Sequence, residues 1–165
     1  MQNIYLVGFM ATGKTSVGRE LAKRLKSEFF DLDDLIEQRE GMAIVDIFKQ
    51  KGEPYFRRIE SGIIKEVSQK SDLVVGCGGG AVVDTENLAS LKKSGLIICL
   101  KAGPDTILSR SQGTEQRPLL NVEDPQSRIK DLLAKREPFY SKSDHIIETT
   151  KLDINAVVEK IILIL

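Results

Sequence analysis

The hydrophobic positions of this chain fall into short apolar runs separated by longer segments of helical period. The runs are rich in aliphatic and aromatic side chains and predict five strands, at residues 3–8, 28–31, 73–77, 96–101 and 145–149. Between the first two runs, Val17, Leu21 and Leu25 recur every four residues, as in an amphipathic helix. Strands and helices that alternate in this way predict an α/β fold, with a parallel sheet between two layers of helices.

The end of the chain carries the clearest helical pattern. Six aliphatic side chains between Ile154 and Leu165 follow i, i+3, i+4 spacing, and Asp153 stands before them as a candidate N-cap. This apolar stripe predicts a helix that packs on the sheet and not a membrane anchor.

Two segments depart from the alternation. Residues 33–70 have a mostly helical pattern, broken at Gly41 and at residues 52–54, and predict a helical insertion after the second strand. Residues 111–125 are polar, contain glycine and proline and lack any period, which predicts a long mobile loop. Loops of that length in compact domains are often functional. We find no repeat and no linker, so residues 1–165 are interpreted as a single domain.

Length, charge and composition narrow the function classes. The 165 residues suit one domain of roughly 150 residues. Lys plus Arg and Asp plus Glu number 24 each, so the formal net charge is zero and no global attraction to nucleic acid or anionic lipid is expected. The longest apolar runs have five residues, against roughly 20 for a membrane span. With no basic N-terminal region, we expect a cytoplasmic protein, and its size and neutrality suit a monomer.

The two cysteines and the single histidine do not form a metal or catalytic site. Cys77 and Cys99 sit inside apolar runs without metal-ligand spacing, so we expect buried, reduced thiols. His145 alone makes neither a metal site nor a catalytic triad.

A phosphate-binding motif follows the first strand. Residues 8–15 read GFMATGKT and match GxxxxGK[ST], in which backbone N–H groups surround a phosphate, the lysine reaches the β- and γ-phosphate oxygens and the hydroxyl binds Mg²⁺. A chain of this composition matches by chance about 0.01 times, so an incidental glycine turn is a poor explanation. The motif predicts that a nucleotide is bound by Gly8, Ala11, Thr12, Gly13, Lys14, Thr15 and Ser16.

The motif indicates a nucleotide but not the reaction. A switch GTPase needs DxxG, which is absent, and its base-reading motif has only a near match at residues 141–144, before a strand instead of after one. An ATPase motor usually has an aliphatic strand that ends in Asp, whereas the third strand here leads into Gly78, Gly79 and Gly80. These glycines form a simple turn or let a ligand approach the backbone closely.

Acidic residues cluster at the end of the second strand. Asp31 and Asp33 stand two residues apart, so their carboxylates share one face if the strand continues, at the edge of the sheet where ligands bind. Alternatively the acids cap the next helix, and Asp34 with Glu37 is a candidate capping box. One aspartate is enough for a cap, so a functional role is favoured for Asp31 and Asp33.

The charged side chains further along the chain give weaker evidence of a functional role. Arg57 and Glu60 are three residues apart on one predicted helix face, where an exposed pair contributes only a few tenths of a kcal/mol. Arg136 comes just before Pro138, which suggests that a helix ends there. Taken alone, each of these arginines is interpreted as a solvated surface side chain. The same interpretation applies to Arg110 and Arg117.

Six motifs together resemble a known family. GFMATGKTS, FDLD, FRRIE, CGGGAV, RPLL and REPFY occur in the order and approximate spacing of the shikimate kinases, over residues 4 to about 140. The resemblance implies the nucleoside monophosphate kinase fold, a P-loop fold with strand order 2-3-1-4-5. It also implies transfer of the γ-phosphoryl group of MgATP to the 3-hydroxyl group of shikimate, in aromatic amino acid biosynthesis.

The resemblance implies roles for the candidate residues. Thr15 and, through water, Asp31 would hold Mg²⁺. Arg110 and Arg117 would contact ATP, and Arg117 would belong to a closing lid over residues 111–125. The insertion at 33–70 and the glycine turn would form the shikimate site, with Asp33, Arg57, Glu60, Gly78, Gly79, Gly80 and Arg136.

The chemistry of shikimate agrees with these roles. It has one carboxylate on a ring with three hydroxyl groups, so Arg57 and Arg136 suit the carboxylate and Asp33 suits a hydroxyl. Asp33 is the candidate base or orienting group, since phosphoryl transfer depends on positioning and charge neutralisation. Lys14 and Arg117 are expected to stabilise charge on the transferred group, and closure of the lid to exclude water.

The sequence departs from the family pattern at two places. Ala11 stands where the family usually has glycine. Alanine is therefore expected to exclude a backbone conformation that glycine can adopt. Residues 149–152 match the adenine-contacting loop only loosely, and no adenine contact is assigned there.

Two alternative functions stay open. Another small kinase of this fold would phosphorylate gluconate or a nucleoside monophosphate. A regulatory module without catalysis would bind ATP and phosphorylate nothing, but the lysine, acids and arginines disfavour it.

Overall fold

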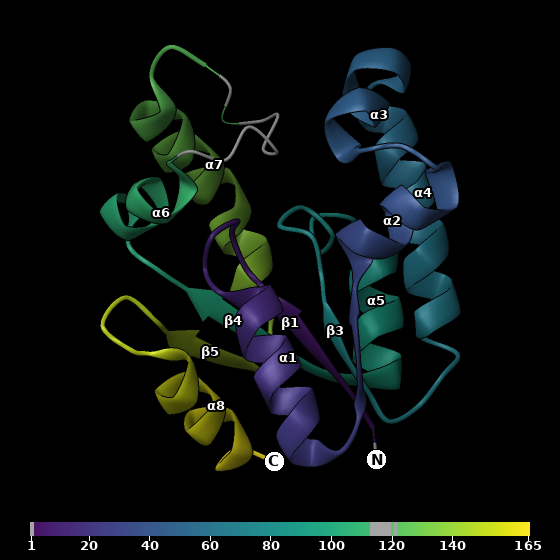
Figure 1. Cartoon of the computed structure of the whole chain (residues 1–165), viewed down its shortest axis with the longest axis vertical. Helices are drawn as coiled ribbons and strands as arrows, with labels where there is room; N and C mark the ends of the chain where they lie inside the picture. Colours follow the sequence, from purple (N-terminus) through teal and green to yellow (C-terminus); the bar gives the residue numbers. More distant parts are fainter. Residues whose placement is uncertain (1, 113–119, 121) are drawn as a thin grey trace.

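One sheet of five parallel strands runs through the centre of the computed structural model, which describes residues 2–112, 120 and 122–165. The strands are β1 (Asn3–Val7), β2 (Glu28–Asp31), β3 (Leu73–Gly76), β4 (Gly95–Lys101) and β5 (His145–Glu148) (Figure 1). Their order across the sheet is β2-β3-β1-β4-β5. Each strand begins and ends within one residue of its predicted bounds, and the strand order implied by the resemblance is confirmed.

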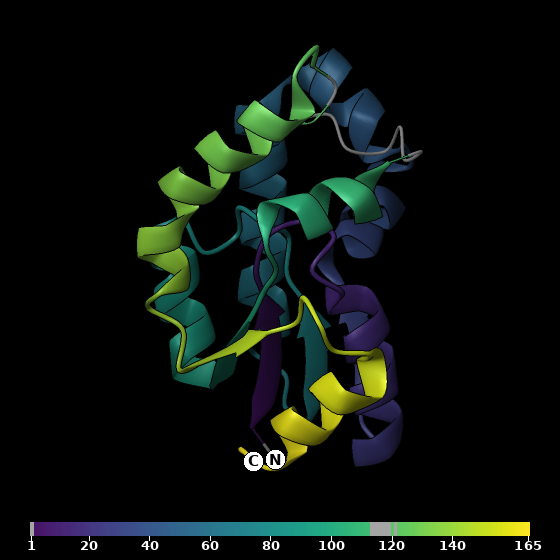
Figure 2. The same ribbon diagram turned by 90° about the vertical axis from the view of Figure 1, so that its left-hand side faces the viewer.

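Helices cover both faces of the sheet, as Figure 2 shows. Those in the described residues are α1 (Lys14–Leu25), α2 (Leu32–Glu40), α3 (Ile44–Lys51), α4 (Glu53–Val67), α5 (Thr85–Ser94), α6 (Pro104–Ser111), α7 (Pro125–Tyr140) and α8 (Ile154–Ile162). The α/β fold class predicted from the alternation of elements is therefore confirmed.

Alternation along β1 separates two hydrophobic cores. Ile4 and Leu6 point to one face of the sheet, where they join buried side chains of α1 and α8. Tyr5 and Val7 point to the other face, where buried side chains of α4, α5 and α7 complete the core. Because both faces are covered, the central strands are mostly apolar, with the buried side chain of Asn3 at the start of β1 as a polar exception.

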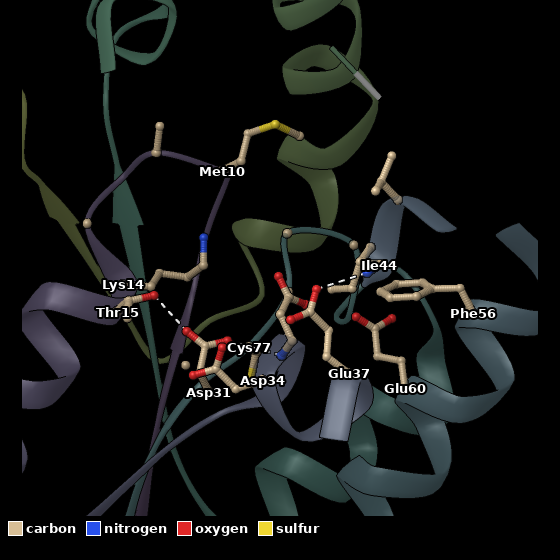
Figure 3. Close-up of a pocket in the computed structure, with 18 of the residues that line it drawn as sticks. Met10, Lys14, Thr15, Asp31, Asp34, Glu37, Ile44, Phe56, Glu60 and Cys77 are labelled. Carbon is tan, nitrogen blue, oxygen red and sulfur yellow. Dashed lines mark hydrogen bonds between the residues drawn. The ribbon is translucent and has the colours of Figure 1, made fainter. Parts of the chain in front are cut away.

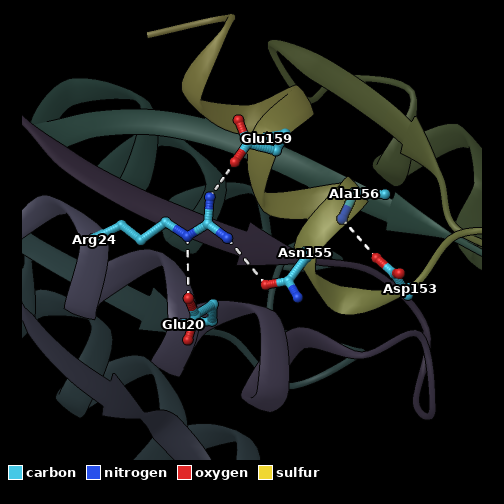
Figure 4. Close-up of polar contacts among 6 residues, drawn as sticks. All are labelled: Glu20, Arg24, Asp153, Asn155, Ala156 and Glu159. Atoms are coloured by element: carbon cyan, nitrogen blue, oxygen red, sulfur yellow. Dashed lines mark hydrogen bonds and ion pairs between the residues drawn. The ribbon is translucent and has the colours of Figure 1, made fainter.

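Polar contacts join α8 to α1 (Figure 4). Arg24 of α1 forms an ion pair with Glu159 of α8 and another with Glu20 of its own helix, the latter at 3.0 Å. The same guanidinium donates to the side-chain oxygen of Asn155 at 3.0 Å. Asp153 is the N-cap of α8, as predicted, because its carboxylate accepts a backbone N–H of the first turn at 2.7 Å.

The segment predicted as a helical insertion forms α2, α3 and α4, which lie beyond the end of β2 (Figure 1). Gly41 (φ +66°) ends α2 and Gly52 (φ +81°) separates α3 from α4, at the predicted breaks. Glycine adopts these positive φ angles without strain. Glu40 joins the three helices, since its carboxylate accepts hydrogen bonds from Lys51 at 2.9 Å and Tyr55 at 2.8 Å.

The α7 helix ends at Tyr140, two residues after Pro138, so the prediction that the helix is ending at this proline is confirmed. A proline in the last turn removes one intrahelical hydrogen bond, and the buried Tyr140, 1% exposed, holds that turn against the core. Residues 113–119 and 121 of the predicted lid, Arg117 among them, lie outside the described residues.

The two cysteines are buried and free, as predicted. Burial raises the pKa of both thiols, so Cys77 and Cys99 stay protonated at neutral pH. Within the described part of the chain, no helix is both long enough and apolar enough to cross a membrane.

Candidate active site

The phosphate-binding motif forms the turn between β1 and α1. Gly8 leaves the strand with φ +132°, and a Cβ atom there would lie 2.2 Å from the carbonyl oxygen of Leu100 on β4. Glycine alone fits both that angle and that close approach. Gly13 (φ +98°) is the N-cap of α1 and supplies no capping side chain, so the first N–H groups of the helix suit an anion.

Ala11 adopts the backbone conformation that a glycine would use. Its φ is +61°, in the left-handed region, so the expectation that alanine closes this conformation is wrong. The strain costs about 1–2 kcal/mol for an L-residue. The guanidinium of Arg110 donates to the carbonyl oxygens of Ala11 at 3.3 Å and Thr149 at 3.4 Å, which places Arg110 beside the phosphate-binding turn.

Lys14 lies against the same turn. Its Nζ donates to the carbonyl oxygens of Gly8 at 2.9 Å and Phe9 at 2.7 Å. The Thr12 hydroxyl donates to the same Phe9 carbonyl at 2.8 Å. A phosphate oxygen is a stronger partner for the ammonium than these carbonyls, because both partners then carry charge.

Asp31 connects the turn to the second strand. Its Oδ2 accepts a hydrogen bond from the Thr15 hydroxyl at 2.6 Å (Figure 3). Its Oδ1 accepts one from the backbone N–H of Asp33 at 3.0 Å. Asp31 is therefore both the N-cap of α2 and a side chain of the site. The predicted capping box of Asp34 and Glu37 is wrong. The helix begins earlier, at Leu32, and the Glu37 carboxylate accepts a hydrogen bond from the backbone N–H of Ile44 in α3 at 2.9 Å.

Asp33 lies in the first turn of α2, not on the strand as expected, because β2 ends at Asp31 and leads directly into the helix. Burial raises the pKa of Asp33 to about 7, and the negative charges of Asp31 and Glu60 add to the rise, whereas Lys14 and Arg57 lower it. The carboxyl group therefore titrates near neutral pH, where a general base is most effective.

Arg57 and Glu60 do not form the exposed pair that their spacing alone suggested. Glu60 is fully buried, and its Oε2 accepts a hydrogen bond from Nη1 of Arg57 at 2.8 Å. Burial raises the pKa of Glu60, and Arg57 lowers it. Oε1 of Glu60 has no hydrogen-bond partner among the described residues, which costs about 1–3 kcal/mol for a buried acceptor. A ligand hydroxyl would satisfy it.

Arg136 is also buried, at 7% exposed, instead of solvated. Its guanidinium carbon lies 5.4 Å from the ring centroid of Phe9, in a cation–π contact with the phosphate-binding turn. Nη1 has no hydrogen-bond partner within the described ranges. Because a buried charged donor without a hydrogen-bond partner is costly, Nη1 is matched to an anionic ligand.

The Gly78–Gly80 turn after β3 packs directly against these charged side chains. A Cβ atom at its three positions would lie 2.6, 3.0 and 2.6 Å from atoms of Glu60, Arg136 and Arg57, respectively. Each glycine lets one charged group approach the backbone closely. The turn is therefore part of the site and not a simple connection.

These elements enclose one cavity of about 630 Å³ at the carboxyl ends of the strands (Figure 3). The predicted site residues that line it are Ala11, Gly13, Lys14, Thr15, Ser16, Asp31, Asp33, Arg57, Glu60, Gly78, Gly79, Gly80, Arg110 and Arg136. Gly8 and Thr12 are buried and shape the turn without lining the cavity. Arg117 falls in the part of the chain that is not described.

Comparison with known proteins agrees with this geometry. The sequence model described as "Shikimate kinase" matches residues 10–165. A shikimate kinase from Thermodesulfovibrio yellowstonii is 49% identical over 162 residues, which cover 98% of this chain and 94% of that protein. The chain belongs to the shikimate kinase family.

Solved structures of shikimate kinases have the same fold as this chain. A structure described as shikimate kinase from Acinetobacter baumannii in complex with shikimate superposes with a TM-score of 0.97, at 38% identity, covering 99% of this chain and 92% of that one. As a shikimate kinase family member, the chain is an ATP-dependent phosphotransferase. A gluconokinase from Sinorhizobium meliloti, 16% identical with a TM-score of 0.62, shares the fold alone, so the gluconate alternative is less well supported.

The sequence analysis missed the apolar wall of this shikimate kinase family site. Ile44, Val45 and Phe48 of α3 and Phe56 of α4 line the cavity, and the two phenylalanine rings lie 4.9 Å apart. A signal was present, because Phe56 directly precedes Arg57 in the FRRIE motif. Ile44, Val45 and Phe48 lie on the short helix α3, half of whose residues are apolar, so part of its surface must be shielded from water.

Proposed function

We propose that this chain transfers the γ-phosphoryl group of ATP to the 3-hydroxyl group of shikimate. The observation that carries the proposal is the buried guanidinium of Arg136, whose Nη1 is without a partner in the described residues and lines the same cavity as the phosphate-binding turn. A small acceptor with a carboxylate would satisfy that donor within reach of a bound nucleotide.

The two ends of the cavity suit the two ends of such an acceptor. Arg57 and Arg136 supply guanidinium groups for its carboxylate, and Phe48 and Phe56 supply an apolar wall for its ring. Asp33 supplies a carboxylate for the reacting hydroxyl group. In this role Asp33 orients the hydroxyl and accepts its proton as the phosphoryl group arrives.

The phosphate-binding turn holds ATP in this proposal. Lys14 exchanges its backbone carbonyl partners for phosphate oxygens and neutralises their charge. Arg110 contacts the nucleotide from α6, and Arg117 with the 111–125 lid closes over it to exclude water. We also propose that the enzyme acts as a monomer in the cytoplasm, which its neutral charge and size suit.

Oxygen ligands for Mg²⁺ are present beside the turn. The Thr15 hydroxyl and the Asp31 carboxylate lie 2.6 Å apart on the cavity wall, and hydroxyl, carboxylate and phosphate oxygens are the donors that Mg²⁺ prefers. Thr15 would bind the ion directly and Asp31 through water. When bound, the ion neutralises charge on the β- and γ-phosphates.

The direct test measures ADP release from ATP with three acceptors. The purified chain is expected to turn over ATP with shikimate, and not with gluconate or AMP. Activity with gluconate or AMP but not with shikimate would assign the chain to another acceptor. ATP binding without turnover of any acceptor would identify a regulatory module.

The pH dependence of the reaction is expected to follow Asp33. Since burial and neighbouring acids raise the pKa of this carboxyl group to about 7, its basic form accumulates as pH rises through neutrality. We expect kcat/KM for shikimate to rise about tenfold for each pH unit below 7 and to level off above it. Steady-state rates between pH 5.5 and 8.5, roughly 1.5 units either side of that pKa, measure the profile. A flat profile contradicts a titrating base.

Substituting Gly80 with alanine is expected to weaken shikimate binding with little effect on folding. The new Cβ atom would lie 2.6 Å from Nη2 of Arg57, the flexible end of that side chain, which must then move away from the cavity. We expect the KM for shikimate to rise about tenfold, equivalent to one displaced charge-assisted bond. Gly62→Ala on α4 is the control, because nothing lies within 4 Å of its Cβ position. Equal KM values for both variants contradict the prediction.

A further inference from the structure

Tyr140 joins the two parts of the site that bind the acceptor. It is the last residue of α7 and is 1% exposed, yet its hydroxyl reaches the Gly78–Gly80 turn, where it donates to the carbonyl oxygen of Gly79 at 2.5 Å. Burial raises the pKa of this hydroxyl, so it stays protonated and remains a donor throughout the working pH range.

Arg136 lies one helical turn before Tyr140 on the same face of α7. Its guanidinium lowers the pKa of the Tyr140 hydroxyl, against the effect of burial, which places the two groups in electrostatic contact. On the other side, Nη1 of Arg136 lies 3.0 Å from the position that a Cβ atom of Gly79 would take. The Tyr140 hydroxyl, the Gly79 carbonyl and the Arg136 guanidinium are therefore contiguous.

Three successive glycines need such an anchor. Glycine loses more conformational freedom on ordering than any other residue, and this turn has no side chains that could hold it. Its internal hydrogen bonds run from Ala81 N–H to the Gly78 carbonyl and from Val83 N–H to the Gly80 carbonyl, which leaves the Gly79 carbonyl to the hydroxyl of Tyr140.

We propose that Tyr140 is a positioning residue for the acceptor: its hydroxyl holds the Gly79 carbonyl against α7 and so presets the turn and the Arg136 guanidinium for a carboxylate. The inference rests on the proposed function, because it concerns the same acceptor site. Tyr140 lies outside the cavity lining, so it acts through Gly79 and Arg136 and not by contact with the substrate.

The test compares Tyr140→Phe with Tyr5→Phe. Both variants keep a buried ring and remove one hydroxyl, but the Tyr5 hydroxyl bonds to Ser94 at 2.7 Å and Asn3 at 2.9 Å, away from the cavity lining. Tyr140→Phe is expected to raise the KM for shikimate about tenfold, with kcat and the KM for ATP within about twofold of wild type. Tyr5→Phe is expected to lower the melting temperature and leave all three kinetic values unchanged.

A second measurement asks whether Tyr140 acts through Arg136. In an Arg136→Lys background, adding Tyr140→Phe is expected to raise the KM for shikimate by less than about threefold, since the geometry of the guanidinium is already lost. An unchanged KM in Tyr140→Phe overturns the inference, as does a full tenfold effect in the Arg136→Lys background. A Tyr140→Phe protein that fails to fold where Tyr5→Phe folds also overturns it, because the hydroxyl is then structural. Absence of shikimate phosphorylation by the wild-type chain is a different result, which rejects the proposed function before any variant is compared.

Discussion

Asp33→Asn is expected to lower kcat with shikimate by about 10²–10⁴-fold, the usual contribution of a general base. Asparagine keeps the shape of the side chain and can still orient the hydroxyl, but it cannot accept a proton. The KM for ATP is expected to stay within about twofold of wild type, because Lys14 and the phosphate-binding turn are unchanged. Stopped-time assays of ADP release at saturating shikimate measure the loss.

The same substitution is expected to stabilise the folded protein above pH 7. The pKa of Asp33 is about 7 in the folded chain against an ordinary value of 3.8, so between these values the folded state binds more protons than the unfolded one. Wild-type stability therefore falls as pH rises through this window, and asparagine removes the fall. We expect Asp33→Asn to gain roughly 2–4 kcal/mol at pH 8 and almost nothing near pH 4, by thermal unfolding.

Asp46→Asn is the matched control for Asp33→Asn. Asp46 lies in the first turn of α3, as Asp33 lies in the first turn of α2, but it does not line the cavity. It is expected to leave kcat unchanged. If both variants lose activity equally, or if Asp33→Asn impairs only ATP binding, the role assigned to Asp33 is wrong.

Arg136→Ala is expected to raise the KM for shikimate by roughly 10²–10³-fold. Hydrogen bonds from a buried guanidinium to a carboxylate contribute about 1.5–2 kcal/mol each at the lower end of the usual range, so the loss of two gives about 3–4 kcal/mol. The effect on kcat is expected to be much smaller, because Arg136 binds the end of the acceptor that does not react. Calorimetric titration with shikimate, in the absence of ATP, measures the same loss as a dissociation constant.

Lys135→Ala controls for removal of a positive charge from α7. Lys135 is the neighbouring residue, exposed and outside the cavity lining, so its loss changes the helix charge equally without touching the acceptor. We expect shikimate KM to stay within about twofold of wild type. A selective rise in the KM for ATP in Arg136→Ala, with shikimate binding intact, contradicts a carboxylate-binding role.

Features set by neighbouring residues could be predicted from the sequence. The strands, the phosphate-binding turn and the breaks at Gly41 and Gly52 depend on spacing within about ten residues, and the structure has all of them. The order of strands across the sheet is not a local property, and it was predicted only through the resemblance of six motifs to a family.

Errors arose where long-range packing changes the meaning of a residue. Taken alone, Arg136 and Glu60 were interpreted as solvated because charged side chains usually are, yet both are buried against the turn after β3. Asp31 was treated as either a cap or a site residue, but a strand that leads directly into a helix lets one carboxylate do both. The bond from Tyr140 to Gly79 joins residues 61 positions apart and leaves no pattern in the sequence.

By itself, the sequence determined the alternation of strands and helices, the nucleotide-binding turn and the set of charged residues available for an acceptor. These depend on the period of apolar side chains and on the backbone freedom of glycine, which act over a few positions. The tertiary structure alone decided which of the charged residues lose water, which face one cavity and what pKa the central aspartate takes. Burial and electrostatic coupling depend on segments that are distant in the chain and adjacent only after folding.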